Sequence, residues 1–376
     1  MGDEEAEAAG RVIRSGWVTQ GPEVAAFEEE FAAFTGAAHA VAASSCTTAL
    51  HLALVGLGVG PGDEIITVSH SYIATANAIA YCGARPVFVD VDRTTRNLDP
   101  ILLESAITDR TRAILCVHQM GMPCDLGAIA EVAQRHGLDV IEDAACAVGS
   151  EVRVSDRWER IGRPHSRVAC FSFHPRKVMS TGDGGMLTTD DESLASMFRL
   201  LRQHGMTVSD RQRHGSDTVV FEEHRVLGFN YRMTDIQAAV GRVQLGRLPG
   251  IVSKRRELAD GYRQLLADTS VTAPEEPADR RSNWQSYCVA LGEQCDQRAV
   301  MQFMLDRGIA TRRGIMCAHR EQPYLDESAG LPNSEWCQDH TIILPLYVQM
   351  SGHDVERVAT TLMEAVREVA GSPVAS

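Results

Sequence analysis

Short apolar runs alternate with amphipathic stretches along the chain from about residue 39 onward. The apolar runs are rich in β-branched residues and are punctuated by Gly and Asp, which is typical of buried strands; they fall at residues 40–44, 64–70, 86–92, 112–118, 138–145, 168–174 and 184–190. The intervening stretches 46–59, 72–83 and 126–137 have a helical pattern. Buried strands with helices between them indicate a mainly parallel sheet that is covered on both faces. We therefore predict an α/β fold.

A long helical pattern occupies residues 234–268, and the chain changes character after it. Thr234 can cap the start of this helix, and Pro249 with Gly250 is expected to kink or break it. Further on, two strand patterns and two helical patterns alternate in a compact α+β arrangement; they fall at residues 282–291, 297–308, 309–314 and 354–370. We expect a large domain over residues 1–250, into which residues 1–38 lead, and a small domain over residues 251–376.

Composition and charge narrow the class of protein. The chain has 376 residues, of which 44% are hydrophobic and 23% charged, so a core of good size can form. The net charge of −14 argues against a nucleic-acid groove or an anionic membrane surface as the partner. No apolar run reaches the roughly 18 residues of a membrane span, and the acidic start does not resemble a secretory signal.

The pattern of the ten cysteines also narrows the class of protein. None of them forms a Cys-x-x-Cys pair, so we expect neither a structural zinc site nor another metal centre. Most lie among apolar neighbours, which favours buried free thiols in a reducing compartment. We therefore expect a cytoplasmic protein.

The stretch "FSFHPRKVMSTGDGGM", residues 171–186, places Lys177 between a predicted strand and a glycine-rich turn. Asp143 and Glu142 stand at the end of another predicted strand, where open α/β sheets bind their ligands. A lysine amine attacks a carbonyl only when it is deprotonated, so its pKa should fall through burial or through cations such as His174 and Arg176. Taken alone, a surface lysine and a carboxylate in a helix cap or salt bridge remain open alternatives.

Two further stretches carry small polar or aromatic residues at strand ends. "SSCTTAL", residues 44–50, precedes a helix, and its Cys46 and Thr47 would present backbone N–H groups to a phosphate; a simple helix cap is the alternative. Ser172 could add a hydroxyl to the same site. Tyr72 could stack on a planar ring, although a core aromatic is the common alternative.

Together these features describe a site for pyridoxal 5′-phosphate (PLP). Lys177 would form the Schiff base with the cofactor aldehyde, and Asp143 would keep the pyridine nitrogen protonated, so that the ring acts as an electron sink. Residues 45–48 and Ser172 would hold the phosphate, and Tyr72 would cover one face of the ring.

The chain also resembles the DegT-type aminotransferases, the nucleotide-sugar aminotransferase branch of fold-type I PLP enzymes. The resemblance extends over nearly the whole chain, from "GWVTQGPEVAAFEEEFAAFTG" through "SSCTTALHLAL", "VIEDAA" and "FSFHPRKVMSTGDGGMLTT" to "NYRMTDIQAAVGRVQL" and "NWQSY". It implies that Asn230 reaches the phosphate of the partner subunit, and hence a homodimer with shared active sites. It also implies that His319 lies near the substrate, and it makes one of Arg312 and Arg313 a candidate for an anionic substrate group.

Two departures from the family pattern concern the cofactor. Cys46 stands where the family usually has a glycine in the phosphate loop. Cys146 stands where the family usually has Gln or His, which bonds the phenolic oxygen of the cofactor, and a thiol is a weaker hydrogen-bond partner. Lys177 is retained, which disfavours the dehydratase branch of the family, where a histidine occupies this position.

We therefore expect a PLP-dependent aminotransferase with L-glutamate as donor and a nucleotide-linked keto sugar as acceptor. A keto-cyclitol or another small ketone is the alternative acceptor, suggested by Cys146, and a panel of acceptors separates the two. A non-catalytic regulatory protein on the same fold is the third possibility. The intact Asp143 and Lys177 count against that possibility, and the activity of a Lys177→Ala variant decides it.

Overall fold

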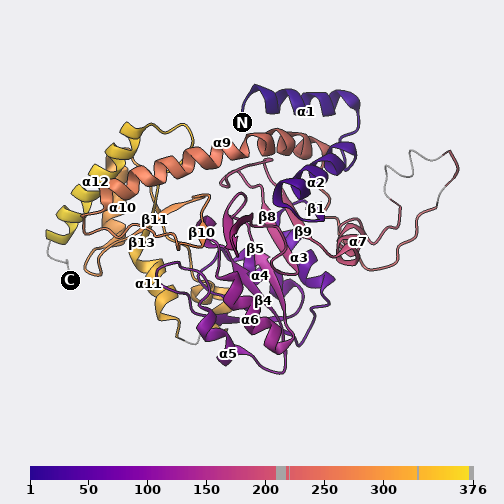
Figure 1. Ribbon diagram of the computed structural model, residues 1–376, viewed down its shortest axis with the longest axis horizontal. Helices are drawn as coiled ribbons and strands as arrows, with labels where there is room; N and C mark the ends of the chain where they lie inside the picture. Colours follow the sequence, from indigo (N-terminus) through magenta and orange to yellow (C-terminus); the bar gives the residue numbers. More distant parts are fainter. Residues whose placement is uncertain (209–216, 220, 328–329, 372–376) are drawn as a thin grey trace.

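The computed structural model describes residues 1–208, 217–219, 221–327 and 330–371 (Figure 1). Its centre is a seven-stranded sheet in the order β1-β9-β8-β5-β4-β2-β3. Every strand is parallel to the others except β9, which runs antiparallel to both its neighbours. The strands are β1 His39–Ala43, β2 Glu64–Val68, β3 Arg85–Val89, β4 Thr111–Val117, β5 Asp139–Asp143, β8 Val168–Ser172 and β9 Gly185–Thr189. The predicted α/β fold with a mainly parallel sheet is confirmed, and all seven predicted strands form.

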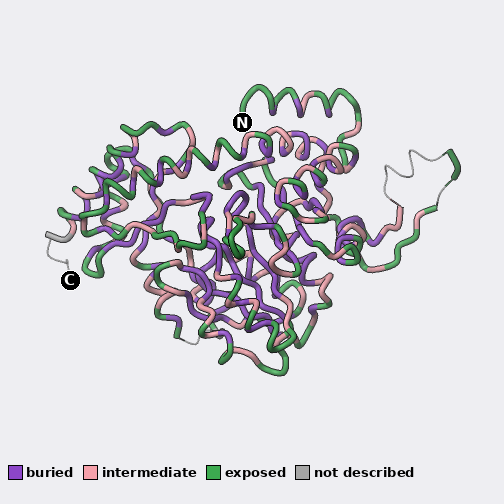
Figure 2. Tube along the Cα trace, in the orientation of Figure 1, coloured by how far each residue is buried: buried purple, intermediate pink, exposed green. Residues whose placement is uncertain are grey.

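Helices pack against this sheet and bury it, so that the strands trace the buried centre of the molecule in Figure 2. α3 Cys46–Gly56, α4 Ala74–Tyr81 and α6 Leu126–His136 lie where the sequence predicts them. The sequence analysis did not assign α1 Asp3–Ser15, α2 Pro22–Thr35, α5 Leu103–Ala106, α7 Glu192–Leu201 or the 3₁₀ turns η1 Pro100–Leu102 and η2 Gln119–Gly121. Aromatic side chains of α2 and β8 pack edge to face, and the ring centroids of Phe31 and Phe171 are 5.1 Å apart. This contact fixes β8, and with it the loop that carries Lys177.

The long helix α9, Asp235–Leu266, joins two separate hydrophobic clusters. Thr234 caps it as predicted, with Oγ1 accepting the N–H of Gln237 at 3.2 Å. Of the kink or break predicted at Pro249, the break does not occur, since the helix continues through this residue. Proline removes one hydrogen bond, but Leu248 on one side is buried in the large cluster and Leu258 on the other in the small one. The division into residues 1–250 and 251–376 remains a proposal, which the two clusters support.

The C-terminal region forms a second sheet in the order β11-β13-β12, all antiparallel. Its strands are β11 Tyr287–Ala290, β12 Arg312–Arg313 and β13 Thr341–Leu344, and it carries α10 Gln297–Asp306 and α12 Gly352–Gly371. The central strand, β13, was not predicted. η3 Ala318–Arg320, η4 Gln322–Glu327 and α11 Pro332–His340 connect β12 to β13. Cys337 of α11 belongs to the hydrophobic cluster of the large sheet, so this connection packs against that sheet.

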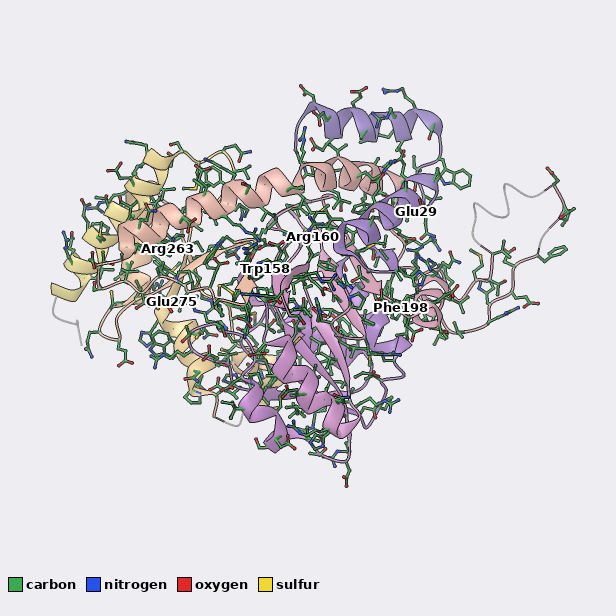
Figure 3. The ribbon with its side chains drawn as sticks, viewed as in Figure 1. Glu29, Trp158, Arg160, Phe198, Arg263 and Glu275 are labelled. Atoms are coloured by element: carbon green, nitrogen blue, oxygen red, sulfur yellow. The ribbon has the colours of Figure 1, made fainter. Side chains whose placement is uncertain are left out.

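A small third sheet was also missed by the sequence analysis. β6 Glu151–Val154 and β7 Arg157–Arg160 form a hairpin, and β10 Arg280–Arg281 pairs with β6. Trp158 of the hairpin, labelled in Figure 3, lies under the guanidinium of Arg281 at 3.9 Å from the ring centroid. Within the described ranges, the structure contains no helix that is both long and apolar enough to cross a membrane.

Candidate active site

The site lies at the carboxyl ends of β5 and β8. These strands are parallel neighbours, with Asp143 paired to Cys170, so their ends share one edge of the sheet. Asp143 is the last residue of β5. Lys177 follows β8 in a turn in which its N–H donates to the carbonyl of His174 at 2.8 Å. The residues between Asp143 and Lys177 form the strands β6 and β7 and then β8, which returns the chain to the same edge of the large sheet.

Asp143 is buried, with 4% of its surface exposed. Its Oδ2 accepts the hydroxyl of Thr75 at 2.8 Å, and its Oδ1 accepts the N–H of Ala145 at 3.1 Å. Burial raises the pKa of Asp143, and the Thr75 hydrogen bond opposes that rise only in part. Thr75 is held in turn by the hydroxyl of Ser71 at 2.9 Å. The sequence analysis missed Thr75; the only signal was a hydroxyl within the helix that follows Tyr72.

Glu142 points to the opposite side of the sheet. Its carboxylate accepts the hydroxyl of Ser166 at 2.7 Å and pairs with Nε2 of His118 at 2.8 Å. The N–H of Cys124 donates to Nδ1 of the same histidine at 2.9 Å, so Nε2 carries the ring proton and donates to Glu142. Glu142 is therefore neither a helix cap nor part of a surface salt bridge, but a fully buried member of an internal hydrogen-bond network.

Lys177 is half-buried, and its Nζ lies 3.2 Å from Sγ of Cys146. Burial pushes the pKa of Lys177 down, but the Cys146 sulfur and, more weakly, the Asp143 carboxylate outweigh it, so the pKa lies above its ordinary value. The expected lowering of this pKa is wrong for the polypeptide on its own. The reason is that His174 and Arg176 are exposed, so the amine faces sulfur and carboxylate rather than cations.

The phosphate loop has the geometry of a helix start. Ser45 caps α3 by accepting the N–H of Thr48 at 3.2 Å, which confirms the cap reading for Ser45. Cys46 and Thr47 occupy the first turn, where backbone N–H groups have no partner within the helix. The Cys46 sulfur lies 3.7 Å from the Cys170 carbonyl and is buried. The side chain that replaces the family glycine therefore points into the protein.

Two neighbouring strands bring further groups to this loop. Gly185 of β9 pairs with Ala43 on one side and with Ser172 on the other, so Ser172 lies beside the loop. A Cβ on Gly185 would stand 2.4 Å from the carbonyl oxygen of Ser45. Only glycine allows β9 to approach the loop this closely. The residues present thus fit PLP: an amine, a buried carboxylate and a tightly packed helix N-terminus meet at one sheet edge.

Tyr72 and Asn230 are exposed in the single chain. Tyr72 precedes α4 with 69% of its surface accessible, so it is not the core aromatic of the alternative reading. Asn230 forms an isolated bridge with Gln203. The stretch 207–224, which the sequence marks as polar and irregular, lies partly outside the described residues, at 209–216 and 220. The roles of Tyr72 and Asn230 in cofactor binding remain predictions.

His319 is buried, and both its ring nitrogens already have protein partners. Nδ1 lies 2.6 Å from the hydroxyl of Ser69, and Nε2 lies 3.3 Å from the carboxylate of Glu335. These contacts attach η3 to the residue that follows β2. The predicted contact between His319 and substrate remains a prediction, and the geometry favours a positioning role.

Arg312 and Arg313 differ in their surroundings. Arg313 lies 4.0 Å from the carboxylate of Glu321. Burial and the positive charge of Arg176 both lower the pKa of Arg312, which places Arg312 on the side of the residue that precedes Lys177. The influence of Arg176 on Arg312 favours Arg312 over Arg313, and the contact of either arginine with substrate remains a prediction.

Comparison with known proteins identifies the group to which the chain belongs. The model of the DegT/DnrJ/EryC1/StrS aminotransferase family matches residues 1–363. The spore coat polysaccharide biosynthesis protein SpsC of Bacillus subtilis is 39% identical over 98% of this chain and 95% of its own length.

Solved structures agree with the family match. The aminotransferase TlmJ from Streptoalloteichus hindustanus is 35% identical, with a TM-score of 0.90 over 99% of this chain and 98% of its own. Spr1654 from Streptococcus pneumoniae, solved in its PLP form, is 26% identical, with a TM-score of 0.90 over 98% of this chain and 97% of its own. The chain therefore belongs to the DegT/DnrJ/EryC1/StrS aminotransferase family, and the protein is a PLP-dependent aminotransferase.

Proposed function

We propose that the enzyme moves an amino group from L-glutamate to a nucleotide-linked keto sugar. The observation that carries the proposal is the convergence of Lys177, the buried Asp143 and the start of α3 at one edge of the sheet. The name of SpsC, a polysaccharide biosynthesis protein with 39% identity to this chain, supports a sugar as the acceptor.

Each residue of the site has a role that follows from its chemistry. When bound, PLP supplies an electron sink for the carbon that loses or gains a proton. Asp143, oriented by Thr75, would hold the proton on the ring nitrogen. Nζ of Lys177 would carry the cofactor at rest and then move the proton at the substrate carbon as general acid and base. The backbone of Cys46 and Thr47, with Ser172, would bind the phosphate, and Tyr72 would cover the ring.

We further propose a homodimer with shared sites in the cytoplasm. Asn230 is exposed, and the preceding segment presents Phe221 and Leu227 with 86% and 91% of their surfaces accessible. Exposed large apolar side chains favour contact with a second chain. The ten cysteines are free thiols, and eight of them are buried, which supports a reducing compartment.

The proposal is tested by activity and by covalent trapping. Purified enzyme should aminate a keto sugar linked to a nucleoside diphosphate when L-glutamate is supplied, with ping-pong kinetics. Borohydride should fix the cofactor on Lys177, as peptide mass spectrometry would show. Lys177→Ala should abolish turnover, because general acid–base catalysis alone contributes about 10²–10⁴-fold.

A panel of acceptors separates the remaining alternatives. Turnover of a keto-cyclitol with no amination of any nucleotide sugar would replace the proposed acceptor. A wild-type protein that shows no visible absorption after addition of PLP and no trapped lysine would remove the proposed role of Lys177 itself.

A further inference from the structure

The position of Cys146 beside the reactive amine is a feature that the proposed function leaves unused. Cys146 follows β5 by three residues and is half-buried, and its sulfur is the hydrogen-bond partner of Lys177 Nζ at 3.2 Å. An ammonium group has donors only, so the sulfur is the acceptor in this contact.

The small domain holds Cys146 in this position. The side chain of Asn283 donates to the carbonyl of Cys146 at 2.8 Å and to that of Val148 at 2.8 Å. The N–H of Asn283 donates to Ser150 at 3.0 Å. A Cβ on Gly121 would lie 2.1 Å from the amide oxygen of Asn283, so this packing leaves the loop little freedom. The sulfur is therefore a fixed part of the wall around the amine.

We infer that Cys146 is a positioning residue that holds the Lys177 amine before the cofactor binds. With Cys146 in place, the nitrogen that links Lys177 to the cofactor keeps its proton to a higher pH than it would with a side-chain amide at this position. The inference rests on the proposed role of Lys177. The 3.2 Å contact places the sulfur beside the nitrogen to which the cofactor would be linked, and the resemblance implies that residue 146 meets the phenolic oxygen of the ring. A thiol donates a weaker hydrogen bond than an amide N–H, so negative charge on that oxygen is less stabilised. The proton that this oxygen shares with the lysine nitrogen is then held more tightly.

The groups that surround the amine allow the sulfur to have this effect. The titratable side chains with the largest effect on the pKa of Lys177 are Cys146 from the loop after β5, Cys46 from α3 and Asp143 from β5, and none of these three is a cation. A donor placed at residue 146 would therefore be the main stabiliser of negative charge on this side of the ring.

The first test is a pH titration of the visible absorption of the loaded enzyme. Cys146→Gln should move the midpoint of the colour change down by about one pH unit, a tenfold change in proton affinity. Cys146→Ser, which is smaller and safer for folding, should move it in the same direction by less. Cys82→Ser, outside the site, should leave it unchanged. A Gln variant that binds PLP normally and titrates like wild type would overturn the inference.

The second test asks whether the thiol faces the cofactor, without using activity. Iodoacetamide should alkylate Cys146 of the cofactor-free protein, and PLP loading should slow this reaction several-fold while Cys82 reacts as before, as measured by peptide mass spectrometry. Equal alkylation of Cys146 with and without PLP would place the sulfur away from the ring and contradict the inference. Failure of the wild type to bind PLP would instead contradict the proposed function.

Discussion

Glu142 and Asp143 are neighbours in one strand, yet they have different roles because successive side chains point to opposite faces of a sheet. Glu142 is enclosed by His118 and Ser166, whereas Asp143 faces the site under Thr75. The strand therefore supplies one carboxylate to the internal hydrogen-bond network and one to the candidate site. The same alternation separates Arg312 from Arg313.

Arg312 should select an anionic substrate. Neither it nor Arg176 has an ion-pair partner within the part of the chain that the structure describes, and the two positive charges repel each other. A bound anion would remove that repulsion. Arg312→Ala should therefore raise KM for the anionic acceptor about tenfold, equivalent to about 1.4 kcal/mol, with little change in kcat.

Arg313→Ala is the matched control, since Arg313 is 4.0 Å from Glu321 and should change KM little. Steady-state kinetics at two ionic strengths should show a weaker salt dependence for the Arg312 variant only. Equal effects of the two substitutions would contradict the assignment of Arg312 to the site.

Glu64 should make stability depend on acid pH. It is 1% exposed and accepts hydrogen bonds from Arg85 at 2.8 Å, Arg110 at 2.6 Å and Thr108 at 2.6 Å. Burial raises the pKa of Glu64, but these donors outweigh it and lower the pKa from 4.5 to about 2. Because the folded pKa lies below the unfolded one, the stabilisation is complete above about pH 4.5 and is lost as the pH falls toward 2.

Glu64→Gln should lower the free energy of unfolding by about 1–3 kcal/mol at pH 7, and the gap to wild type should close on acidification. Urea unfolding of the wild type and the variant, from neutral to acid pH, measures this gap in the free energy of unfolding. Glu104→Gln, at a surface pair with Arg135, should change stability little. A gap that stays constant with pH would show that the Glu64 carboxylate charge is not what stabilises the fold.

At the scale of elements, α9 is fitted closely to α2 and to the loop after Lys177. A Cβ on Gly241 would lie 2.7 Å from the ring of Phe27 and 3.0 Å from the methyl of Thr181. Gly241→Ala should therefore destabilise the protein by about 1–3 kcal/mol. Gly246, in the same helix, has no atom within 4 Å of such a Cβ.

Gly246→Ala should accordingly stabilise the protein by about 0.5–1 kcal/mol through helix propensity. Thermal and urea unfolding of both variants measure these changes in stability, and so compare steric crowding with helix propensity within one helix. If Gly241→Ala were as stable as Gly246→Ala, α9 would not be packed against α2 as closely as described.

The elements that the sequence predicted are those with a strong local pattern. The large sheet, α9, α10 and α12 have periodic apolar positions that can be read without knowing their neighbours. β13 was missed because it has only four residues and its partners β11 and β12 lie far back in the chain. The β6–β7 hairpin was missed because most of its residues are at least partly exposed.

The site shows the same limit. Lys177, Asp143 and the start of α3 could be found because each lies at or just after the end of a predicted strand. Thr75 and Asn283 could not, because they reach Asp143 and Cys146 across 68 and 137 residues of sequence. No local pattern records a contact of that kind. Nor could the pattern show that Ser69 and Glu335 already occupy the nitrogens of His319.

At the scale of the whole molecule, the C-terminal region supports the loop that carries Lys177. Arg255 of α9 donates to the carbonyls of Trp284 at 2.9 Å, Gln285 at 2.7 Å and Leu346 at 3.0 Å. The side chain of Gln285 then donates to the carbonyl of Arg176 at 2.9 Å, next to Lys177. One helix thus links the C-terminal core to the loop that carries the reactive amine.

In the proposed dimer, Asn230 of each chain contributes to the partner's active site, and mixing of variant subunits tests this. Lys177→Ala removes the amine, and Asn230→Asp places a negative charge where we propose that the partner's phosphate binds. Each variant alone should be inactive or should bind PLP poorly. If Asn230 acts across the interface, a dimer with one subunit of each kind has one site with both Lys177 and Asn230 intact.

Unfolding and refolding the two variants together in equal amounts should then restore about a quarter of the sites, because half of the dimers are mixed and each has one complete site. Mixing Lys177→Ala with Asp143→Ala is the control. Both of these residues lie in the same subunit's site, so no mixed dimer has a complete one, and activity should stay absent. If Lys177→Ala mixed with Asn230→Asp gave no more activity than this control, Asn230 would act within its own chain. The exposed segment around Leu227 would then need another partner.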